Sequence, residues 1–289
     1  MEPRSTFESH RLKTAERAVE AALAEDVGDG DITSLLVVPE GMRARAEIIS
    51  REEGVIAGLR VAGIAFKRVD SEVVFRPLVP EGAEVRPGDA VARVEGEARG
   101  IFAAERVALN FLQHLSGIAT LTARFVSAVA PYAAKIYDTR KTLPGLRELE
   151  KYAVAIGGGV NHRFGLFDGI LIKDNHLKVA GGVKNAVLAA KSGSSDAPIE
   201  VEVETLNELD EALQAGADIV LLDNMDPLEL AEAVKRTAGR AILEASGGVT
   251  LENVAEIARS GVDRISIGAI TQGAKPLDLT LEVVRAFME

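Results

Sequence analysis

The chain has 289 residues, enough for one large domain or two modest ones, and its 33 lysines and arginines against 44 aspartates and glutamates give a formal net charge of −11. This acidity argues against a non-specific nucleic-acid binder or a protein that docks on an anionic membrane. The absence of cysteine excludes disulfides, thiolate metal sites and a cysteine nucleophile.

The N-terminal part predicts a helix followed by short strands. The first 17 residues are charged throughout and lack the apolar core of a signal peptide, so we expect a cytoplasmic protein. Residues 10–26 carry apolar side chains at helical spacing, and the turn at residues 28–31 ends that helix.

Residues 44–94 predict strands, because short β-branched runs alternate with turn residues. Examples are residues 46–49, residues 73–75 and a hairpin-like pair around residues 85–89, with a helix at 58–67 between them. The uncharged stretch 107–123 contains polar side chains and predicts a buried helix rather than a membrane span.

From about residue 136 onward, apolar runs are each followed by a helical segment. The runs are residues 135–137, 169–172, 199–204, 219–222, 241–243 and 264–267. This alternation predicts a parallel βα architecture. At least six strands without a glycine-rich dinucleotide turn favour a closed barrel over a doubly wound sheet.

Charged residues or glycine turns end almost every one of these predicted strands. In a βα barrel the active site lies at this end of the strands. The candidate segments are residues 138–141, 173–176, Glu202 with Glu204, 223–224, 246–248 and 268–269. One such segment alone is typical of a solvated loop, but six in succession predict a site.

Residues 199–204 alternate strictly between aliphatic side chains and glutamates. The outer face of a barrel strand packs on helices, so the aliphatic side chains point outward. Glu200, Glu202 and Glu204 are therefore predicted to point into the lumen. Buried carboxylates need cations, so the pattern indicates either a substrate site or a purely structural ion network.

Cations are available at the neighbouring strand ends, where Arg140, Lys141 and Lys173 lie. A Mg²⁺ ion held by Glu202 and Asp223 would also suit oxygen ligands and a phosphorylated substrate.

A glycine-rich loop, residues 156–163, adds His162 and Arg163 to these cations. The cluster indicates a small, highly anionic substrate, because arginine suits carboxylates and lysine supplies point charge to phosphate. His162 could instead be an ordinary loop histidine. Residues 246–248 and 266–269 follow the last two strands, where barrels commonly bind phosphate. There is no phosphate loop of an NTPase and no strand-linked GxGxxG.

Three long motifs resemble the quinolinate phosphoribosyltransferase family, the carboxylating nicotinate-nucleotide pyrophosphorylases. They are DTRKTLPGLR at 138–147, GGGVNHR at 157–163 and LIKDNH at 171–176. Further matching segments are residues 25–33, 105–110, 201–204, 222–224 and 244–248. The match runs in order through nearly the whole chain.

The resemblance implies an α/β fold: an N-terminal α/β sandwich and a TIM-like βα barrel with fewer than eight strands. We place the sandwich at residues 1–112 and the barrel at 113–274, with the tail 275–289 packing on the sandwich. The implied reaction joins quinolinate to C1 of the ribose of phosphoribosyl pyrophosphate. It releases pyrophosphate and CO₂ and gives nicotinate mononucleotide for NAD synthesis.

The resemblance also assigns roles to residues. Arg140, His162, Arg163 and Lys173 would hold the two carboxylates of quinolinate. Lys141 and Lys173 would face the phosphoribosyl donor. Glu202 and Asp223 would lie near its ribose and Mg²⁺, in direct contact with the metal or through the pyrophosphate.

The remaining roles concern the donor phosphate and the neighbouring subunit. The loops after the last two strands would bind the 5′-phosphate, and Arg106 would complete the site of the neighbouring subunit in a homodimer. The resemblance leaves dimer and hexamer open. The candidate catalytic residues are Lys141, Lys173, Glu202 and Asp223. The candidate substrate-binding residues are Arg106, Thr139, Arg140, His162, Arg163, Lys173, Ser246, Gly247, Gly248, Ser266 and Gly268.

Two other hypotheses stay open at this point. One is a paralogue of the same fold that takes a different anion and acts beside metal-oxyanion uptake. The other is a non-catalytic sensor of a phosphorylated ligand. The combination of Arg140 with His162 and Arg163 favours a dicarboxylate.

Overall fold

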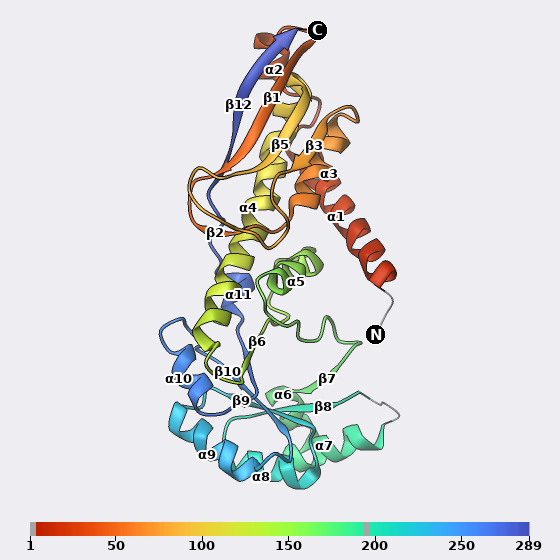
Figure 1. Cartoon of the computed structure of the whole chain (residues 1–289). Helices are drawn as coiled ribbons and strands as arrows, with labels where there is room; N and C mark the ends of the chain where they lie inside the picture. Colours follow the sequence, from red (N-terminus) through yellow and green to blue (C-terminus); the bar gives the residue numbers. More distant parts are fainter. Residues whose placement is uncertain (1–3, 194–196, 289) are drawn as a thin grey trace. The chain divides into compact units, whose positions relative to one another are not determined.

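The computed structural model of the chain describes residues 4–193 and 197–288, which form two compact units (Figure 1). The first unit contains the described residues up to Leu121, the segment Thr142–Gly157 and the described residues from Ala274. The second unit contains Thr122–Lys141 and Gly158–Gly273.

An antiparallel sheet forms the centre of the first unit. Its strand order is β12-β1-β5-β3, with β1 at Met42–Ser50, β3 at Val74–Pro77, β5 at Ala90–Glu97 and β12 at Leu279–Met288. Side chains on β1 alternate in burial, and Ala44, Ala46 and Ile48 point into the core. The C-terminal strand β12 pairs with β1 over its whole length.

The hairpin predicted around residues 85–89 is wrong. The turn joins β4 (Glu84–Val85) to β5, but β4 pairs with β2 (Gly54–Val55) while β5 pairs with β1 and β3. The Pro87-Gly88-Asp89 sequence specifies a turn. A turn sequence does not determine which strands pair on either side of it. Here the Gly88 N–H donates to the Ser50 carbonyl at the end of β1 and not across a hairpin.

Among the described residues, five helices complete this unit or begin in it: α1 at Arg4–Asp26, α2 at Ile32–Val37, α3 at Leu59–Val69, α4 at Ala98–Val129 and α5 at Arg147–Ile156. The predicted helices at 10–26 and 58–67 correspond to α1 and α3. Helix α3 packs on the sheet through Phe66, which stacks on Phe75 of β3 with ring centroids 5.7 Å apart. No helix in the described part of the chain is apolar over a length that could cross a bilayer.

A six-stranded parallel sheet forms the second unit, and all six predicted strands are present. They are β6 at Lys135–Tyr137, β7 at Ile170–Ile172, β8 at Ile199–Val203, β9 at Ile219–Asp223, β10 at Ile242–Ser246 and β11 at Arg264–Ser266. Their spatial order is β6-β11-β10-β9-β8-β7. The helices between them are α6 at Asp174–Ala180, α7 at Val183–Ser192, α8 at Leu206–Ala215, α9 at Pro227–Thr237, α10 at Val254–Arg259 and α11 at Ala269–Gln272.

The sheet curves like a barrel, but no ladder among the described strands joins its two edges, β6 and β7. Val160 forms a parallel bridge with Tyr137 at the β6 edge instead. Residues 161–163 therefore leave the sheet at the same end as Asp138, which follows β6. The buried Asp138 carboxylate accepts the backbone N–H of His162 at 2.8 Å and the side-chain amide of Asn161 at 2.7 Å.

The unit boundaries differ from the predicted boundary between residues 112 and 113. Helix α4 continues through Leu121, so neither a break nor a linker marks where one unit ends. Helix α5, which the prediction placed in the barrel, belongs to the first unit and packs against α1. A boundary inside a continuous amphipathic helix leaves no signal in composition.

Candidate active site

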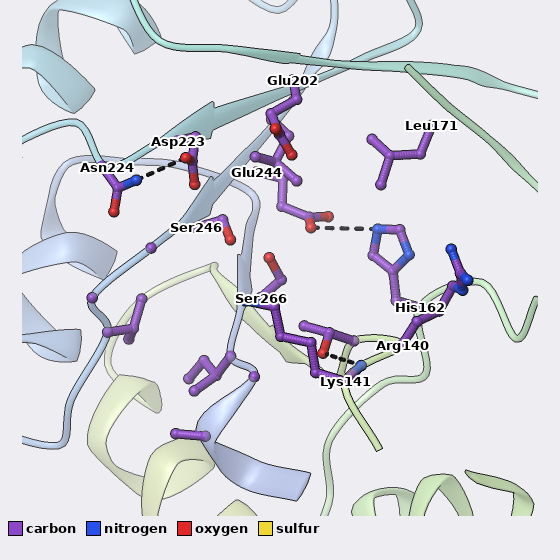
Figure 2. Close-up of a pocket in the computed structure, with 18 of the residues that line it drawn as sticks. Arg140, Lys141, His162, Leu171, Glu202, Asp223, Asn224, Glu244, Ser246 and Ser266 are labelled. Carbon is purple, nitrogen blue, oxygen red and sulfur yellow. Dashed lines mark hydrogen bonds and ion pairs between the residues drawn. The ribbon is translucent and has the colours of Figure 1, made fainter. Parts of the chain in front are cut away.

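A cavity of about 580 Å³ opens at the carboxyl ends of the six parallel strands (Figure 2). Every predicted site residue except Arg106 lines it. These residues are Thr139, Arg140, Lys141, His162, Arg163, Lys173, Glu202, Asp223, Ser246, Gly247, Gly248, Ser266 and Gly268. Arg106 is an exposed residue of α4 in the first unit.

The cavity is also lined by residues that the sequence alone did not indicate as site residues. They are Leu171, Leu221, Asn224, Glu244, Val249, Ile267, Ala269 and Gln272. Strand periodicity could have found Glu244, because it lies two residues before Ser246 and therefore on the same face of β10. In the sheet register Glu244 is paired with Leu221 of β9 and Arg264 of β11.

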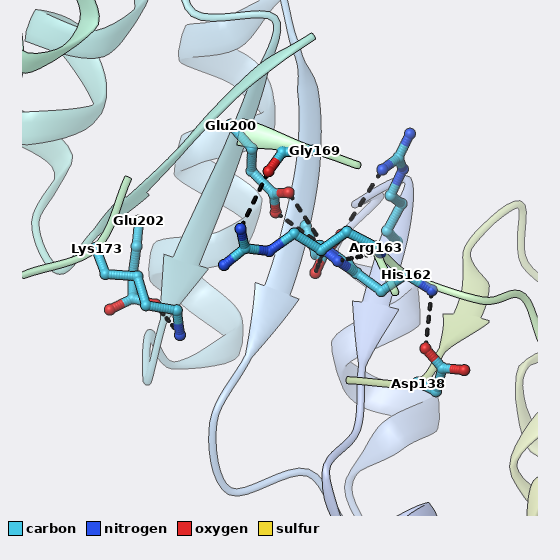
Figure 3. Close-up of polar contacts among 9 residues, drawn as sticks. Asp138, His162, Arg163, Gly169, Lys173, Glu200 and Glu202 are labelled. Atoms are coloured by element: carbon cyan, nitrogen blue, oxygen red, sulfur yellow. Dashed lines mark hydrogen bonds and ion pairs between the residues drawn. The ribbon is translucent and has the colours of Figure 1, made fainter. Parts of the chain in front are cut away.

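The glutamates of β8 follow the predicted alternation only while the strand lasts. Glu200 is buried beside His162, and Glu202 lines the cavity (Figure 3). The prediction that Glu204 points into the lumen is wrong: β8 ends at Val203, and Glu204 is exposed. Its backbone N–H donates to Glu208 at 2.9 Å, so it belongs to the cap of α8.

Two guanidinium groups enter the cavity together. Burial and the nearby Arg140 charge lower the pKa of Arg163, although an arginine stays charged at neutral pH. Arg163 Nη1 donates to the Gly169 carbonyl at 3.1 Å, and its buried Nε donates no hydrogen bond to a described group. Two cations in one small cavity favour the binding of a multiply charged anion.

Two lysines carry positive charge on other walls of the cavity. Lys173 Nζ lies 3.4 Å from a Glu202 oxygen, in a partly exposed ion pair (Figure 3). Lys141 lies against Gly268, where a Cβ atom would come within 3.0 Å of the lysine Cδ. The Lys141 carbonyl accepts the hydroxyl of Thr271, which ties the β6 loop to α11.

An acidic wall faces these cations. Burial, together with the charges of Glu202 and Glu204, raises the pKa of Asp223. A cation bound here would offset the charge of these carboxylates. Carboxylate oxygens are ligands that Mg²⁺ accepts, so Glu202 and Asp223 fit the donor chemistry of a Mg²⁺ ion.

The loop after β10 requires glycine. Asn224, at a positive φ of 55°, donates its backbone N–H to the Ser246 carbonyl at 2.9 Å. Its side-chain amide donates to Asp223 at 2.7 Å. Gly247 has φ of 92°, and a Cβ there would collide with the Asn224 amide oxygen. Glycine at this position therefore lets the loop pack directly against Asn224.

His162 contacts two buried glutamates, Glu200 of β8 and Glu244 of β10, two strands that β9 separates. Its Nε2 is 3.1 Å from a Glu200 oxygen and 3.4 Å from a Glu244 oxygen (Figures 2 and 3). In the part of the chain that the structure describes, these three side chains are the one set of three or more histidine or acidic groups close enough to share a metal ion.

Protonation links the three groups. Burial opposes charge on the His162 ring, but the hydrogen bond to Glu200 and the nearby carboxylate of Glu244 outweigh it and raise the pKa of His162 to about 9. Burial also raises the pKa of Glu200. Both shifts describe one proton that the three groups hold together. Nδ1 of His162 already accepts the backbone N–H of Arg163 at 2.8 Å, so this proton lies on the carboxylate side of the ring.

Comparison with known proteins identifies relatives along nearly the whole chain. The family model "Quinolinate phosphoribosyl transferase, N-terminal domain" matches residues 31–116, and the corresponding C-terminal domain model matches residues 118–282. A carboxylating nicotinate-nucleotide pyrophosphorylase of Mycobacterium leprae is 44% identical over 275 residues, covering 93% of this chain and 97% of that protein. A probable enzyme of the same name from Bacillus subtilis is 42% identical over 260 residues, covering 90% of both chains.

Solved structures show the same similarity. The nicotinate-nucleotide pyrophosphorylase of Francisella tularensis superposes with a TM-score of 0.90 at 42% identity, over 94% of this chain and 96% of that one. The corresponding values for NadC of Streptococcus pyogenes are a TM-score of 0.88 and 40% identity, over 93% and 96% of the two chains.

Proposed function

The chain belongs to the quinolinate phosphoribosyl transferase family, and we propose that it converts quinolinate and phosphoribosyl pyrophosphate to nicotinate mononucleotide, pyrophosphate and CO₂ in NAD biosynthesis. The observation that carries this proposal is the charge distribution of one cavity. The cavity is lined by arginines and lysines, which suit a dicarboxylate and a pyrophosphate. It is also lined by the carboxylates of Glu202 and Asp223, which suit a ribose that develops positive charge.

Quinolinate binding is assigned to Arg140, Arg163 and Lys173. Their cations neutralise the two ring carboxylates and fix the ring so that its nitrogen faces C1 of the ribose. His162 lines the same cavity, and its role is taken up below.

Transfer breaks the bond between C1 and the pyrophosphate oxygen, and the electron pair leaves with pyrophosphate. The ring nitrogen forms the new bond to C1. Glu202 and Asp223 stabilise the positive charge that develops on the ribose, and Lys141 and Lys173 stabilise the departing pyrophosphate. Glu202 and Asp223 would also be the protein oxygen donors to a Mg²⁺ ion, which would neutralise further charge on the phosphates.

Decarboxylation follows at the carbon next to the ring nitrogen. The bond to the carboxyl group breaks, CO₂ leaves, and the electron pair at that carbon takes up a proton. The positive ring nitrogen stabilises this electron pair. No covalent nucleophile is needed, in agreement with the absence of cysteine.

The 5′-phosphate of the donor is assigned to the loops after β10 and β11. Ser246 and Ser266 are paired in the sheet register and both line the cavity. Their hydroxyls, with the backbone at Gly247, Gly248 and Gly268, offer the uncharged donors that commonly surround a phosphate at this position of a barrel.

A cytoplasmic homodimer, alone or within a hexamer, is the proposed working form. Arg106 supports this assembly because it is an exposed cation that does not line the cavity of its own chain. In a dimer it would add a further cation to the neighbouring subunit's quinolinate site.

The direct test measures nicotinate mononucleotide after incubation of the full chain with quinolinate and phosphoribosyl pyrophosphate. We expect product only when both substrates and Mg²⁺ are present. Donor binding without release of pyrophosphate would favour a sensor. No binding of quinolinate, with turnover of another anion, would favour the paralogue.

A further inference from the structure

Both ring nitrogens of His162 are engaged inside the protein (Figure 3). Nε2 hydrogen-bonds to the carboxylate of Glu200 and is in ion-pair contact with Glu244 at 3.4 Å. Nδ1 accepts the backbone N–H of Arg163 at 2.8 Å. A nitrogen that accepts an N–H carries no proton, so the ring proton lies on Nε2 and points at the glutamates.

This arrangement differs from the expectation that His162 holds a substrate carboxylate. An imidazole binds a carboxylate through an N–H, and the Nε2–H already has acceptors in the protein. The ring instead connects a buried carboxylate on one side to the backbone of Arg163 on the other.

We propose that Glu200, with Glu244 behind it, is a positioning residue for quinolinate: it orients the His162 ring, and the ring fixes the backbone of Arg163. The proposal rests on the proposed function, because Arg163 is assigned there to a quinolinate carboxylate. It follows that the Arg163 guanidinium binds a quinolinate carboxylate directly, while His162 fixes the backbone position from which the Arg163 side chain extends.

The burial of the glutamates supports this role. Glu200 is 4% exposed and Glu244 is 0% exposed, and neither Glu244 oxygen accepts a hydrogen bond from a described group. Burying two carboxylates at the base of a cavity is costly unless they hold a partner in place. The cationic groups around them are His162, Arg163, whose charge interacts with that of Glu200, and Arg264, whose Nη1 lies 3.9 Å from Glu244.

The surroundings leave the ring little freedom to turn. The Tyr137 ring meets His162 edge-on, with centroids 6.3 Å apart, and the Arg264 guanidinium lies over the Tyr137 ring at 4.9 Å from its centre. The His162 backbone N–H is held by Asp138. Strands β8 and β10 and the end of β6 thus fix the residue that precedes Arg163.

The kinetic test compares Glu200→Gln with Glu200→Leu. Glutamine retains an oxygen that accepts the Nε2–H, so we expect its KM for quinolinate to stay within about threefold of wild type. Leucine removes the acceptor, and we expect KM for quinolinate to rise about tenfold or more, with KM for the donor within about twofold. Glu211→Leu, at an exposed position of α8, is the matched control.

Two kinetic results would overturn the proposal. If glutamine raises KM for quinolinate as much as leucine does, the charge of Glu200 matters and its acceptor oxygen does not. If Glu200→Leu changes the KM values of both substrates equally, Glu200 stabilises the fold of the barrel and has no specific effect on the position of Arg163.

A spectroscopic test does not depend on activity or on the folding of a variant. The ¹⁵N spectrum of the histidine rings of the full wild-type chain, with His162→Gln used to assign the signals, should show a protonated Nε2 and an unprotonated Nδ1 at neutral pH. A ring protonated on both nitrogens would contradict the proposal, because it would offer an N–H to substrate. Loss of the Nε2 proton that a chelator reverses would show a bound metal ion instead.

The two proposals fail in different ways. If the wild-type enzyme forms no nicotinate mononucleotide, the proposed function fails, whatever the spectrum shows. If the product forms but His162 is doubly protonated, the proposed function stands and the positioning role is wrong.

Discussion

Arg140 and Arg163 place like charges in one small cavity, where burial and, after it, repulsion from Arg140 lower the pKa of Arg163. A dianionic ring relieves that repulsion, whereas a single carboxylate relieves only part of it. We therefore predict that Arg140→Ala weakens quinolinate binding by about 2–4 kcal/mol, or roughly 30-fold to 1,000-fold in Kd.

Titration calorimetry with quinolinate and with nicotinate measures this effect. Nicotinate, which lacks one carboxylate, should bind far more weakly than quinolinate to wild type, and the mutation should narrow the difference between them. Arg236→Ala is the control, because Arg236 forms its ion pairs with Asp210 and Glu232 on the surface of α8 and α9. Equal binding of both ligands to wild type would contradict a dicarboxylate site.

The cluster of His162, Glu200 and Glu244 also makes a prediction about pH. The pKa of His162 is raised from its ordinary 6.5 to about 9, and burial raises that of Glu200, so the folded cluster keeps one proton more than the unfolded chain at neutral pH. Because Nδ1 accepts the Arg163 N–H, this extra proton lies on the carboxylate side, and the ring itself carries only the Nε2 proton. The unfolded chain releases the extra proton earlier. The stabilising contribution of this proton is complete below about pH 6.5 and is lost as pH rises through about 9. Burial of Glu200 acts in the same direction, since it penalises the ionised form.

Urea unfolding between pH 6 and pH 10 tests this prediction. The free energy of unfolding of wild type should fall over this range more steeply than that of Glu200→Gln, which removes one titrating partner. Parallel curves for the two proteins would show that the cluster does not hold the extra proton.

The residues of the site were predictable wherever strand periodicity applied. The alternation in residues 199–204 places Glu200 and Glu202 inside the barrel, and strand ends locate the cations. Glu204 was misplaced because the pattern continues one residue beyond the strand, into a helix cap. The pairing of His162 with Glu200 and Glu244 was not predictable, since it joins three segments that are far apart in sequence.

At the scale of the element, the loop after β10 provides a prediction about glycine. Gly247→Ala adds a Cβ at a positive φ and forces it into Asn224, which in turn holds Asp223. We expect KM for phosphoribosyl pyrophosphate to rise about tenfold, because the phosphate loop and the ribose-facing carboxylate both shift.

Gly239→Ala separates this effect from backbone strain. Gly239 also has a positive φ, of 75°, but nothing lies within 4 Å of a Cβ built there, and it does not line the cavity. It should lower stability by about 1 kcal/mol and leave KM for the donor unchanged. If both variants raise KM equally, strain alone accounts for the effect.

The elements themselves follow from local sequence when their interactions are local. β-branched runs between helical segments predicted all six parallel strands, because each strand is short, apolar and followed by a helix. The turn at residues 85–89 was found, but its strands pair with β2, β1 and β3 and not with each other. Strand partners depend on contacts across the sheet, and a turn motif does not encode them.

At the scale of the whole molecule, the position of Arg106 predicts shared active sites. Arg106→Ala and Lys173→Ala should each be inactive alone. Arg106→Ala lacks the cation that enters the neighbouring subunit's site, and Lys173→Ala lacks a cation of its own chain's cavity. After the two variants are mixed and exchange subunits, heterodimers contain one intact site, and activity should recover to about a quarter of wild type.

The recovery is measured as nicotinate mononucleotide formed before and after mixing. A mixture of Lys173→Ala with Arg140→Ala is the control, because both variants damage the same chain's cavity and no intact site can form. Absence of recovery with Arg106→Ala, despite exchange of subunits, would show that Arg106 does not act across the interface.

The division of the chain was the least predictable feature at this scale. The long helix α4 carries one continuous amphipathic pattern from the first unit into the second. Helix α5 returns to the first unit although it lies between two barrel strands in sequence. Both features depend on which surfaces are buried together, and no linker of glycine, proline or serine marks either of them.

The central claim is that one cavity both transfers the phosphoribosyl group and removes a carboxyl group from the acceptor. Quinolinate labelled in the carboxyl group next to the ring nitrogen tests it most directly. With phosphoribosyl pyrophosphate and Mg²⁺ present, the chain should release labelled CO₂ and pyrophosphate in equal amounts, and neither should form when one substrate is omitted. Pyrophosphate released without labelled CO₂, or labelled CO₂ released without the donor, would contradict the account.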